Sequence, residues 1–159
     1  IVIGTSAGGF QAVKTLLVEL LPTLPVAIII VQHLPNQPND SMLKLIGEVS
    51  PVPVKEAEDK EPIEKGKIYI CPPNYHLLVE MEKRFTLSAE PKVNYSRPSI
   101  DVLFESAAEV YREKLVGLVL TGANADGSAG LRLIKEYGDC SGSTGGRLFR
   151  NAASSVECG

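Results

Sequence analysis

Cysteine is scarce in this chain, and its spacing excludes two kinds of small-domain scaffold. Only 3 cysteines occur in 159 residues, at Cys71, Cys140 and Cys158, and no two of them form a C-x-x-C pair. A disulfide framework or a zinc cluster would need paired or closely spaced cysteines. We therefore expect a protein of the reducing cytoplasm.

Positive charge and long apolar runs are lacking as well. The 16 Lys and Arg residues are outnumbered by 19 Asp and Glu residues, which argues against the basic face that binds nucleic acid. The longest apolar run, residues 26–31, is far shorter than the roughly 20 residues of a helix that inserts into a membrane. An initiator Met and the charged start of a signal peptide are also absent, so we expect a piece of a longer protein.

The size and composition fit one globular domain. The chain is 44% apolar and 22% charged, and a chain of this length typically buries about 70% of its extended surface. We find no repeat or low-complexity linker, so residues 1–159 are expected to form a single domain. After about residue 139 no strand or helix pattern continues, and we expect a loop and a truncated end.

Alternating apolar patterns predict an α/β fold with a mostly parallel sheet. Continuous apolar runs of strand length are typical of parallel sheets covered on both faces, and here they alternate with segments at helical spacing. A hairpin is expected mid-chain, and the charged residues 55–66 are expected to be exposed. The expected strands are 1–3, 26–31, 67–71 and 115–120, the hairpin is 76–80 with 84–88, and the expected helices are 10–21, 41–46, 99–112 and 129–137, the last stopping at Gly138.

The first candidate site is a G-x-S-x-G motif formed by Gly4, Ser6 and Gly8. It lies between an apolar strand and an amphipathic helix, the context of a nucleophile elbow. The glycines would allow a sharp turn and leave room for a substrate, while the helix N-terminus would favour a developing oxyanion. Two alternatives are a turn in which Ser6 only caps the helix and a phosphate-binding loop, which lacks its G-K-[ST] signature here.

Two further candidates also follow strands. His33 comes just after the run 26–31, and Asp126 lies in the glycine-flanked loop 121–127 after the run 115–120. Taken singly, His33 could be an ordinary packed residue and Asp126 a cap for the next helix. Cys71 with His76 is a weak alternative nucleophile, because a cysteine at a strand end is more often buried and inert.

Together these residues predict a catalytic arrangement. Ligands of open parallel sheets bind beyond the carboxyl ends of the strands, where Ser6, His33 and Asp126 are all expected. A serine, an imidazole and a carboxylate at one edge supply a nucleophile, its base and the group that orients the base. The order Ser, His, Asp along the chain differs from that of α/β-hydrolases and of the two familiar serine-protease folds.

Five blocks resemble the catalytic domain of the CheB chemotaxis protein-glutamate methylesterases. The resemblance runs from Ile1 to about Gly138, and the blocks follow the order of the family. They are IVIGTSAGG (1–9), VQHLP (31–35), YICPPNYH (69–76), RPSIDVLF (97–104) and LTGANADGSAG (120–130). The resemblance implies a doubly wound, mainly parallel sheet with helices on both faces and a small antiparallel hairpin.

The resemblance also implies roles for particular residues. Ser6, His33 and Asp126 would form the catalytic triad, and the backbone N–H groups of Ala7 and Ala123 would form the oxyanion hole. The family commonly has Thr and Met at the positions of Ala7 and Ala123, and these departures are expected to affect substrate fit more than chemistry. No metal or cofactor is implied. Arg97, ahead of the helix at 99–112, could orient the site or the substrate, or be an ordinary surface arginine.

The implied substrates are γ-glutamyl methyl esters on the cytoplasmic helices of methyl-accepting chemoreceptors, with deamidation of receptor glutamines as a second activity. The family often carries an inhibitory receiver domain, which is not found in these residues. Two other functions remain open: an esterase or amidase that uses the same triad on a small molecule, and a receptor-docking module without catalysis.

Overall fold

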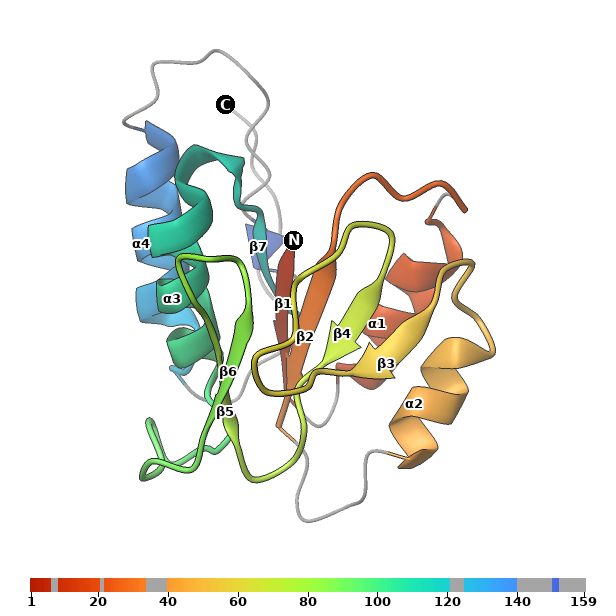
Figure 1. Cartoon of the computed structure of the whole chain (residues 1–159), viewed down its shortest axis with the longest axis horizontal. Helices are drawn as coiled ribbons and strands as arrows, with labels where there is room; N and C mark the ends of the chain where they lie inside the picture. Colours follow the sequence, from red (N-terminus) through yellow and green to blue (C-terminus); the bar gives the residue numbers. More distant parts are fainter. Residues whose placement is uncertain (7–8, 21, 34–39, 121–124, 140–149, 152–159) are drawn as a thin grey trace.

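The structure, a computed structural model, describes residues 1–6, 9–20, 22–33, 40–120, 125–139 and 150–151, with the backbone alone at 40, 41, 139, 150 and 151. Six parallel strands form its central sheet in the order β3-β4-β2-β1-β7-β8 (Figure 1). The strands are β1 (Val2–Thr5), β2 (Ile28–Gln32), β3 (Val54–Glu56), β4 (Ile68–Ile70), β7 (Gly117–Leu120) and β8 (Arg150–Asn151).

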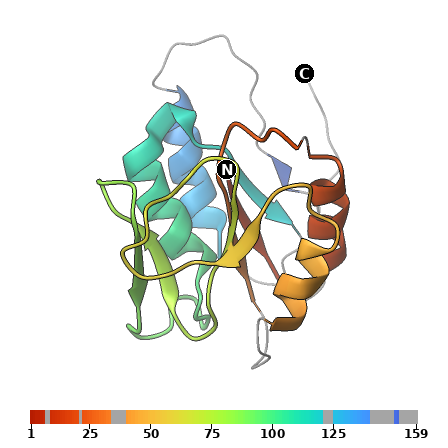
Figure 2. The same cartoon turned by 45° about the vertical axis from the view of Figure 1, so that its right-hand side comes forward.

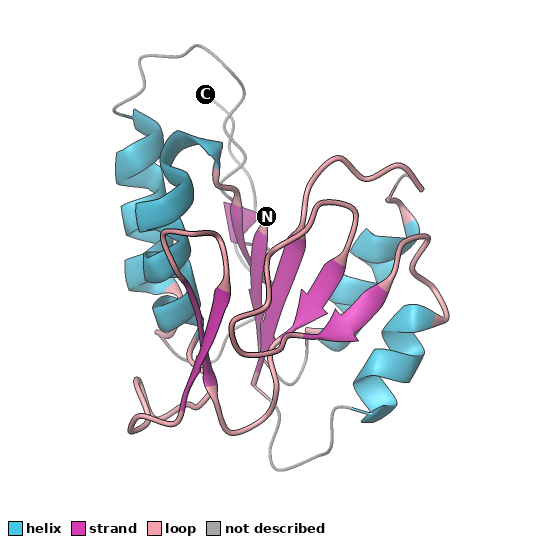
Figure 3. Ribbon diagram, in the orientation of Figure 1, coloured by secondary structure: helices cyan, strands magenta, loops and turns pink. Residues whose placement is uncertain are grey.

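Helices cover both faces of this sheet (Figure 3). On one face lie α1 (Phe10–Val18) and α2 (Asp40–Gly47). On the other lie α3 (Ile100–Tyr111) and α4 (Ser128–Asp139), together with the antiparallel hairpin of β5 (His76–Val79) and β6 (Phe85–Ser88), as the turned view in Figure 2 also shows. A short 3₁₀ turn, Arg112–Lys114, leads from α3 to β7.

The buried strand β2 shows why its sequence is apolar at every position but the last. Ile28 and Ile30 pack into the cluster formed with α1 and α2, whereas Ile29 and Val31 pack into the cluster formed with α3 and α4. Successive side chains of a strand point to opposite faces, so a strand covered on both faces needs an unbroken apolar run.

The doubly wound α/β fold is confirmed. The chain builds the sheet outward from β1 through β2 to β4 and its edge neighbour β3, and then returns to the other side of β1 with β7. The expected mid-chain hairpin is present as β5 and β6. The chain therefore reverses its direction of winding at β1. In such folds a ligand usually binds at this point, beyond the carboxyl ends of the strands.

Several element boundaries predicted from the sequence were wrong. The first helix ends at Val18 rather than near residue 21, consistent with Pro22, which disfavours helical backbone just before it. Gly138 does not stop α4, which runs to Asp139, because a single glycine costs a helix only about 1 kcal/mol.

Two strands lie where no strand was expected. β3 falls at the start of the charged region and pairs only with β4, and such a half-buried edge strand needs no apolar run. β8 lies in the expected C-terminal loop and pairs with β7. The rest of that loop, 140–149 and 152–159, lies outside the described residues.

Candidate active site

Three strands end together at one edge of the sheet, and the candidate residues follow them. Thr5, the last residue of β1, is in register with Gln32 of β2 and with Leu120 of β7. The His33 N–H donates a hydrogen bond to the Thr5 carbonyl over 2.9 Å. Because Ser6 directly follows Thr5, the parallel pairing brings the backbones of the half-buried Ser6 and His33 to neighbouring positions at this edge.

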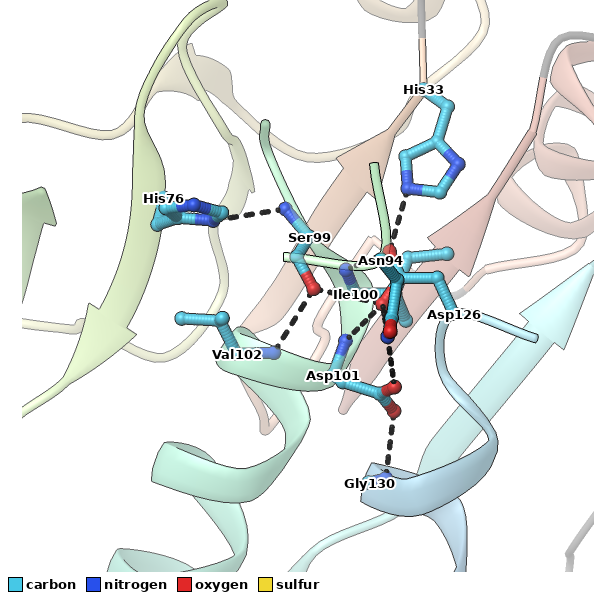
Figure 4. A network of polar contacts seen from close by, with 9 residues as sticks. All are labelled: His33, His76, Asn94, Ser99, Ile100, Asp101, Val102, Asp126 and Gly130. Carbon is cyan, nitrogen blue, oxygen red and sulfur yellow. Dashed lines mark hydrogen bonds and ion pairs between the residues drawn. The ribbon is translucent and has the colours of Figure 1, made fainter. Parts of the chain in front are cut away.

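Asp126 reaches the same edge from the loop after β7. His33 Nε2 lies 2.8 Å from Asp126 Oδ2, and Figure 4 shows the ring directed at the carboxylate. The Asp126 side chain is fully buried, while the His33 side chain remains 15% exposed. An ionised carboxylate only accepts hydrogen bonds, so Nε2 carries the proton and Nδ1 is left to face another partner.

The N-terminus of α3 holds this carboxylate. The Ile100 N–H donates to Oδ2 over 2.7 Å, the Asp101 N–H donates to Oδ1 over 3.0 Å, and the Ser99 hydroxyl donates to Oδ1 over 2.8 Å. Burial opposes the negative charge, but the hydrogen bonds from His33, the two N–H groups and Ser99 outweigh it and hold the pKa of Asp126 well below its usual value. Asp126 is therefore a fixed anion.

Asp126 also acts as a helix cap, for a helix that precedes it in the chain. The sequence left open that Asp126 caps the next helix, whereas these N–H donors lie 26 and 25 residues earlier, at the start of α3. Ser99 is the N-cap residue of α3, and its hydroxyl oxygen accepts a hydrogen bond from the Val102 N–H. The free N–H groups of a helix start thus serve the site.

Two glycines allow α3 to approach the sheet this closely. A Cβ atom on Gly4 would overlap the side chain of Ile100, the first residue of α3, and a Cβ on Gly127 would lie 2.9 Å from it. Gly127 also has a φ of +99°, a backbone angle that residues with a side chain rarely adopt. The first glycine of the G-x-S-x-G motif therefore makes room for a helix, where the sequence suggested a turn and room for substrate; Gly8 lies outside the described residues.

The sequence missed a second carboxylate beside Asp126. Asp101 is buried; its Oδ1 accepts from the Gly130 N–H over 2.8 Å, and its Oδ2 accepts from Asn94 Nδ2 over 2.9 Å. Burial, and after it the charge of Asp126, raises the pKa of Asp101. The sequence signals for Asp101 were its place in the first turn of the helix predicted at 99–112 and in the block RPSIDVLF (97–104).

The second histidine lies behind the site. His76, in β5, is buried; its Nδ1 accepts from the Ser99 N–H over 3.2 Å and its Nε2 donates to the Pro91 carbonyl over 3.0 Å. Figure 4 places it on the side of Ser99 away from His33. His76 therefore supports Ser99, a role that its sequence context did not reveal.

The remaining candidates divide into three groups. Arg97 Nη1 donates to the carbonyls of Ala89 and Glu90 over 2.6 and 3.0 Å, so part of this guanidinium fastens a loop; its substrate role stays a prediction. Ala7 and Ala123, expected in the oxyanion hole, lie outside the described residues. Cys71 is buried, and burial raises the pKa of its thiol, which disfavours it as a nucleophile.

Two other kinds of feature are absent from the described part of the chain. No group of three or more His, Cys, Asp and Glu side chains there is arranged to hold a metal ion. No helix there is long and apolar enough to span a membrane.

Comparison with known proteins shows which family this chain belongs to. The model of the CheB methylesterase family matches residues 1–142. The chain belongs to the CheB methylesterase family. The crystal structure of the CheB methylesterase catalytic domain of Thermotoga maritima superposes with a TM-score of 0.81 and is 36% identical, covering 86% of this chain and 74% of that one.

Relatives of this CheB-family chain carry a double enzyme name. A Leptospira interrogans protein, named provisionally as a protein-glutamate methylesterase/protein-glutamine glutaminase, is 51% identical over 142 residues, covering 87% of this chain and 72% of the relative. The protein-glutamate methylesterase/protein-glutamine glutaminase of Symbiobacterium thermophilum is 36% identical over 138 residues. The match covers 87% of this chain but only 38% of that longer protein.

Proposed function

We propose that this chain hydrolyses γ-glutamyl methyl esters on the cytoplasmic helices of chemoreceptors, with Ser6 as nucleophile, His33 as general base and Asp126 as the group that orients His33. The observation that carries the proposal is the 2.8 Å contact between His33 Nε2 and Asp126 Oδ2 at the strand edge that Ser6 follows. Membership of the CheB methylesterase family supports the choice of substrate.

The reaction proceeds through an ester of the enzyme. Ser6 Oγ attacks the side-chain carbonyl of the methylated glutamate as His33 Nδ1 accepts the hydroxyl proton. The tetrahedral intermediate collapses, the C–O bond to the methoxy group breaks, and His33 returns the proton to methanol. Water, deprotonated by His33, then attacks the glutamyl ester and releases glutamate and free Ser6.

Asp126 contributes orientation and charge to these steps. Its contact with Nε2 fixes the tautomer that presents a free Nδ1 lone pair, and its negative charge stabilises the imidazolium formed in each proton transfer. The hydrogen bonds from α3 keep Asp126 ionised, so the proton stays on His33. Backbone N–H groups of Ala7 and Ala123 are proposed to stabilise the oxyanion, which requires no particular side chain.

The same chemistry serves a primary amide. Attack on a receptor glutamine would release ammonia in place of methanol and leave the same glutamyl ester, which fits the double name of the relatives. We propose the receptor helices as the partner of this chain; a receiver domain elsewhere in a longer protein would act as its regulator.

The decisive test is Ser6→Ala, assayed on membranes that hold receptors labelled with tritiated methyl groups. We expect release of labelled methanol to fall by about 10⁴-fold or more, because no other group replaces the nucleophile. The circular dichroism spectrum should match that of the parent. Retained methanol release would contradict the proposed nucleophile.

Ser50→Ala is the matched control. Ser50 lies between α2 and the start of β3, so it is near the amino-terminal ends of the parallel strands, away from the carboxyl ends where the site lies. Its hydroxyl donates to the Val52 carbonyl. This variant should keep full activity.

The parent protein also distinguishes the two alternative functions. A parent that hydrolyses only small esters would indicate a small-molecule esterase, and a parent that binds receptors without hydrolysing them would indicate a docking module.

A further inference from the structure

We propose that Asn94 is a positioning residue for Asp126, held in place by a tight turn at the surface. The inference deepens the proposed function, because it concerns how the orienting carboxylate is held. Asn94 belongs to none of the sequence motifs that predicted the site.

One amide nitrogen of Asn94 contacts two carboxylates. Asn94 Nδ2 lies 2.9 Å from Asp101 Oδ2 and 3.3 Å from Asp126 Oδ1 (Figure 4). An amide nitrogen carries two hydrogens, so it can donate to both oxygens at once. Asn94 therefore ties the orienting carboxylate to its buried neighbour.

A donor at this point relieves an electrostatic conflict. Asp101 and Asp126 are 5% and 3% exposed, and the charge of each is unfavourable to the other. Among the described residues, the titratable groups that interact with Asp126 include His33, Asp101 and Glu105. The neutral amide places positive hydrogens between the two carboxylates and adds no charge at His33.

The backbone around Asn94 fixes the direction of its side chain. Val93 and Ser96 exchange both backbone hydrogen bonds, at 3.1 and 2.9 Å, across a two-residue turn. The central residues Asn94 and Tyr95 have φ values of +50° and +63°, as in a type I′ turn, in which asparagine is favoured at the first position. Asn94 reaches inward to the carboxylates, whereas Tyr95 is 98% exposed.

Removing the Asn94 amide should change the electrostatic potential at the His33 ring. Asp126 would lose a donor that offsets its charge, so its attraction for the imidazolium of His33 would increase. The carboxylate would also be held less firmly. We therefore expect a lower kcat, an unchanged KM and an acid limb of the kcat/KM profile moved to higher pH.

The test compares Asn94→Gly with the parent. Glycine adopts the same left-handed backbone without steric strain, so the turn is expected to survive the loss of the amide. Since the chain has 2 histidines, imidazole NMR signals follow each separately. We expect the ring-nitrogen NMR signals of His33, which report its hydrogen bond to Asp126, to shift relative to those of the parent and kcat to fall about tenfold, while the signals of buried His76 are little changed.

Tyr95→Asn is the control for the turn, because it changes the other left-handed residue and leaves Asn94 in place. It should preserve both the ring-nitrogen signals of His33 and the pH profile. The proposal is overturned if Asn94→Gly leaves the His33 ring-nitrogen signals where they are in Tyr95→Asn, whatever happens to activity. If the parent releases no methanol from receptors, the proposed function fails, and the His33 signals still decide the role of Asn94.

Discussion

At the scale of single residues, Asp126 has two tasks that are usually separate. Its Oδ2 faces His33 and also accepts from the first N–H of α3, so one carboxylate orients an imidazole and caps a helix. In the sequence alone, catalysis and capping are alternative explanations of Asp126. The two are compatible because they use the same property, a fixed negative charge.

Asp126→Asn should therefore damage both stability and activity. An amide would turn an N–H group toward a donor, either His33 or the start of α3, and we expect a loss of about 1–3 kcal/mol in the free energy of unfolding. By the tautomer argument, kcat should fall by about 10⁴-fold. Urea unfolding and methanol release measure the two losses, and unchanged stability would show that α3 does not depend on this carboxylate.

The stability difference should also depend on pH, with a definite sign. The pKa of Asp126 is lowered in the folded protein from a usual value of 3.8, so its stabilisation is complete above that value. As the pH falls below it, Asp126 is protonated in the unfolded chain before it is protonated in the folded protein. The parent then loses its advantage in unfolding free energy over the variant. The gap in unfolding free energy between parent and Asp126→Asn should shrink below about pH 4, as measured by urea unfolding at each pH.

At the scale of elements, the close approach of α3 to β1 sets the geometry of the site. The overlap expected for a Cβ on Gly4 means that α3 must move away from the strand in Gly4→Ala. We expect a loss of about 1–3 kcal/mol in unfolding free energy, with a further loss of activity as the α3 N–H groups shift relative to Asp126. Gly47→Ala is the control, because nothing lies within 4 Å of its added Cβ.

The elements also show what the sequence could predict. An unbroken apolar run was sufficient for β2, since burial on both faces leaves a direct trace in composition. The edge strand β3 left no such trace, because pairing on one side through the backbone is independent of side-chain type. The strand-end rule predicted that His33 and Asp126 share an edge, but the roles of Asn94, Asp101 and His76 depend on tertiary contacts that no local pattern encodes.

At the scale of the whole molecule, the hairpin shares one core with the sheet and α3. Phe85 of β6 packs its ring against Tyr69 of β4 with the centroids 4.9 Å apart, and both are fully buried. His76 of β5 supports Ser99 beside the site. The hairpin is therefore expected to unfold together with the rest of the domain.

Phe85→Ala tests this unity. We expect a loss of about 3–5 kcal/mol in unfolding free energy, with far- and near-ultraviolet circular dichroism following one transition. Glu82→Ala, at the exposed hairpin turn, should change little. Two separate transitions in the parent would show that the hairpin is an independent unit.

The molecule's imidazoles stand at the two ends of one chain of contacts, from His33 through Asp126 and Ser99 to His76. His33 reaches solvent, with 15% of its side chain exposed, whereas His76 is buried, with 1% of the residue exposed. An acylating reagent such as diethyl pyrocarbonate should thus modify His33 rapidly in the native fold and His76 only after denaturation.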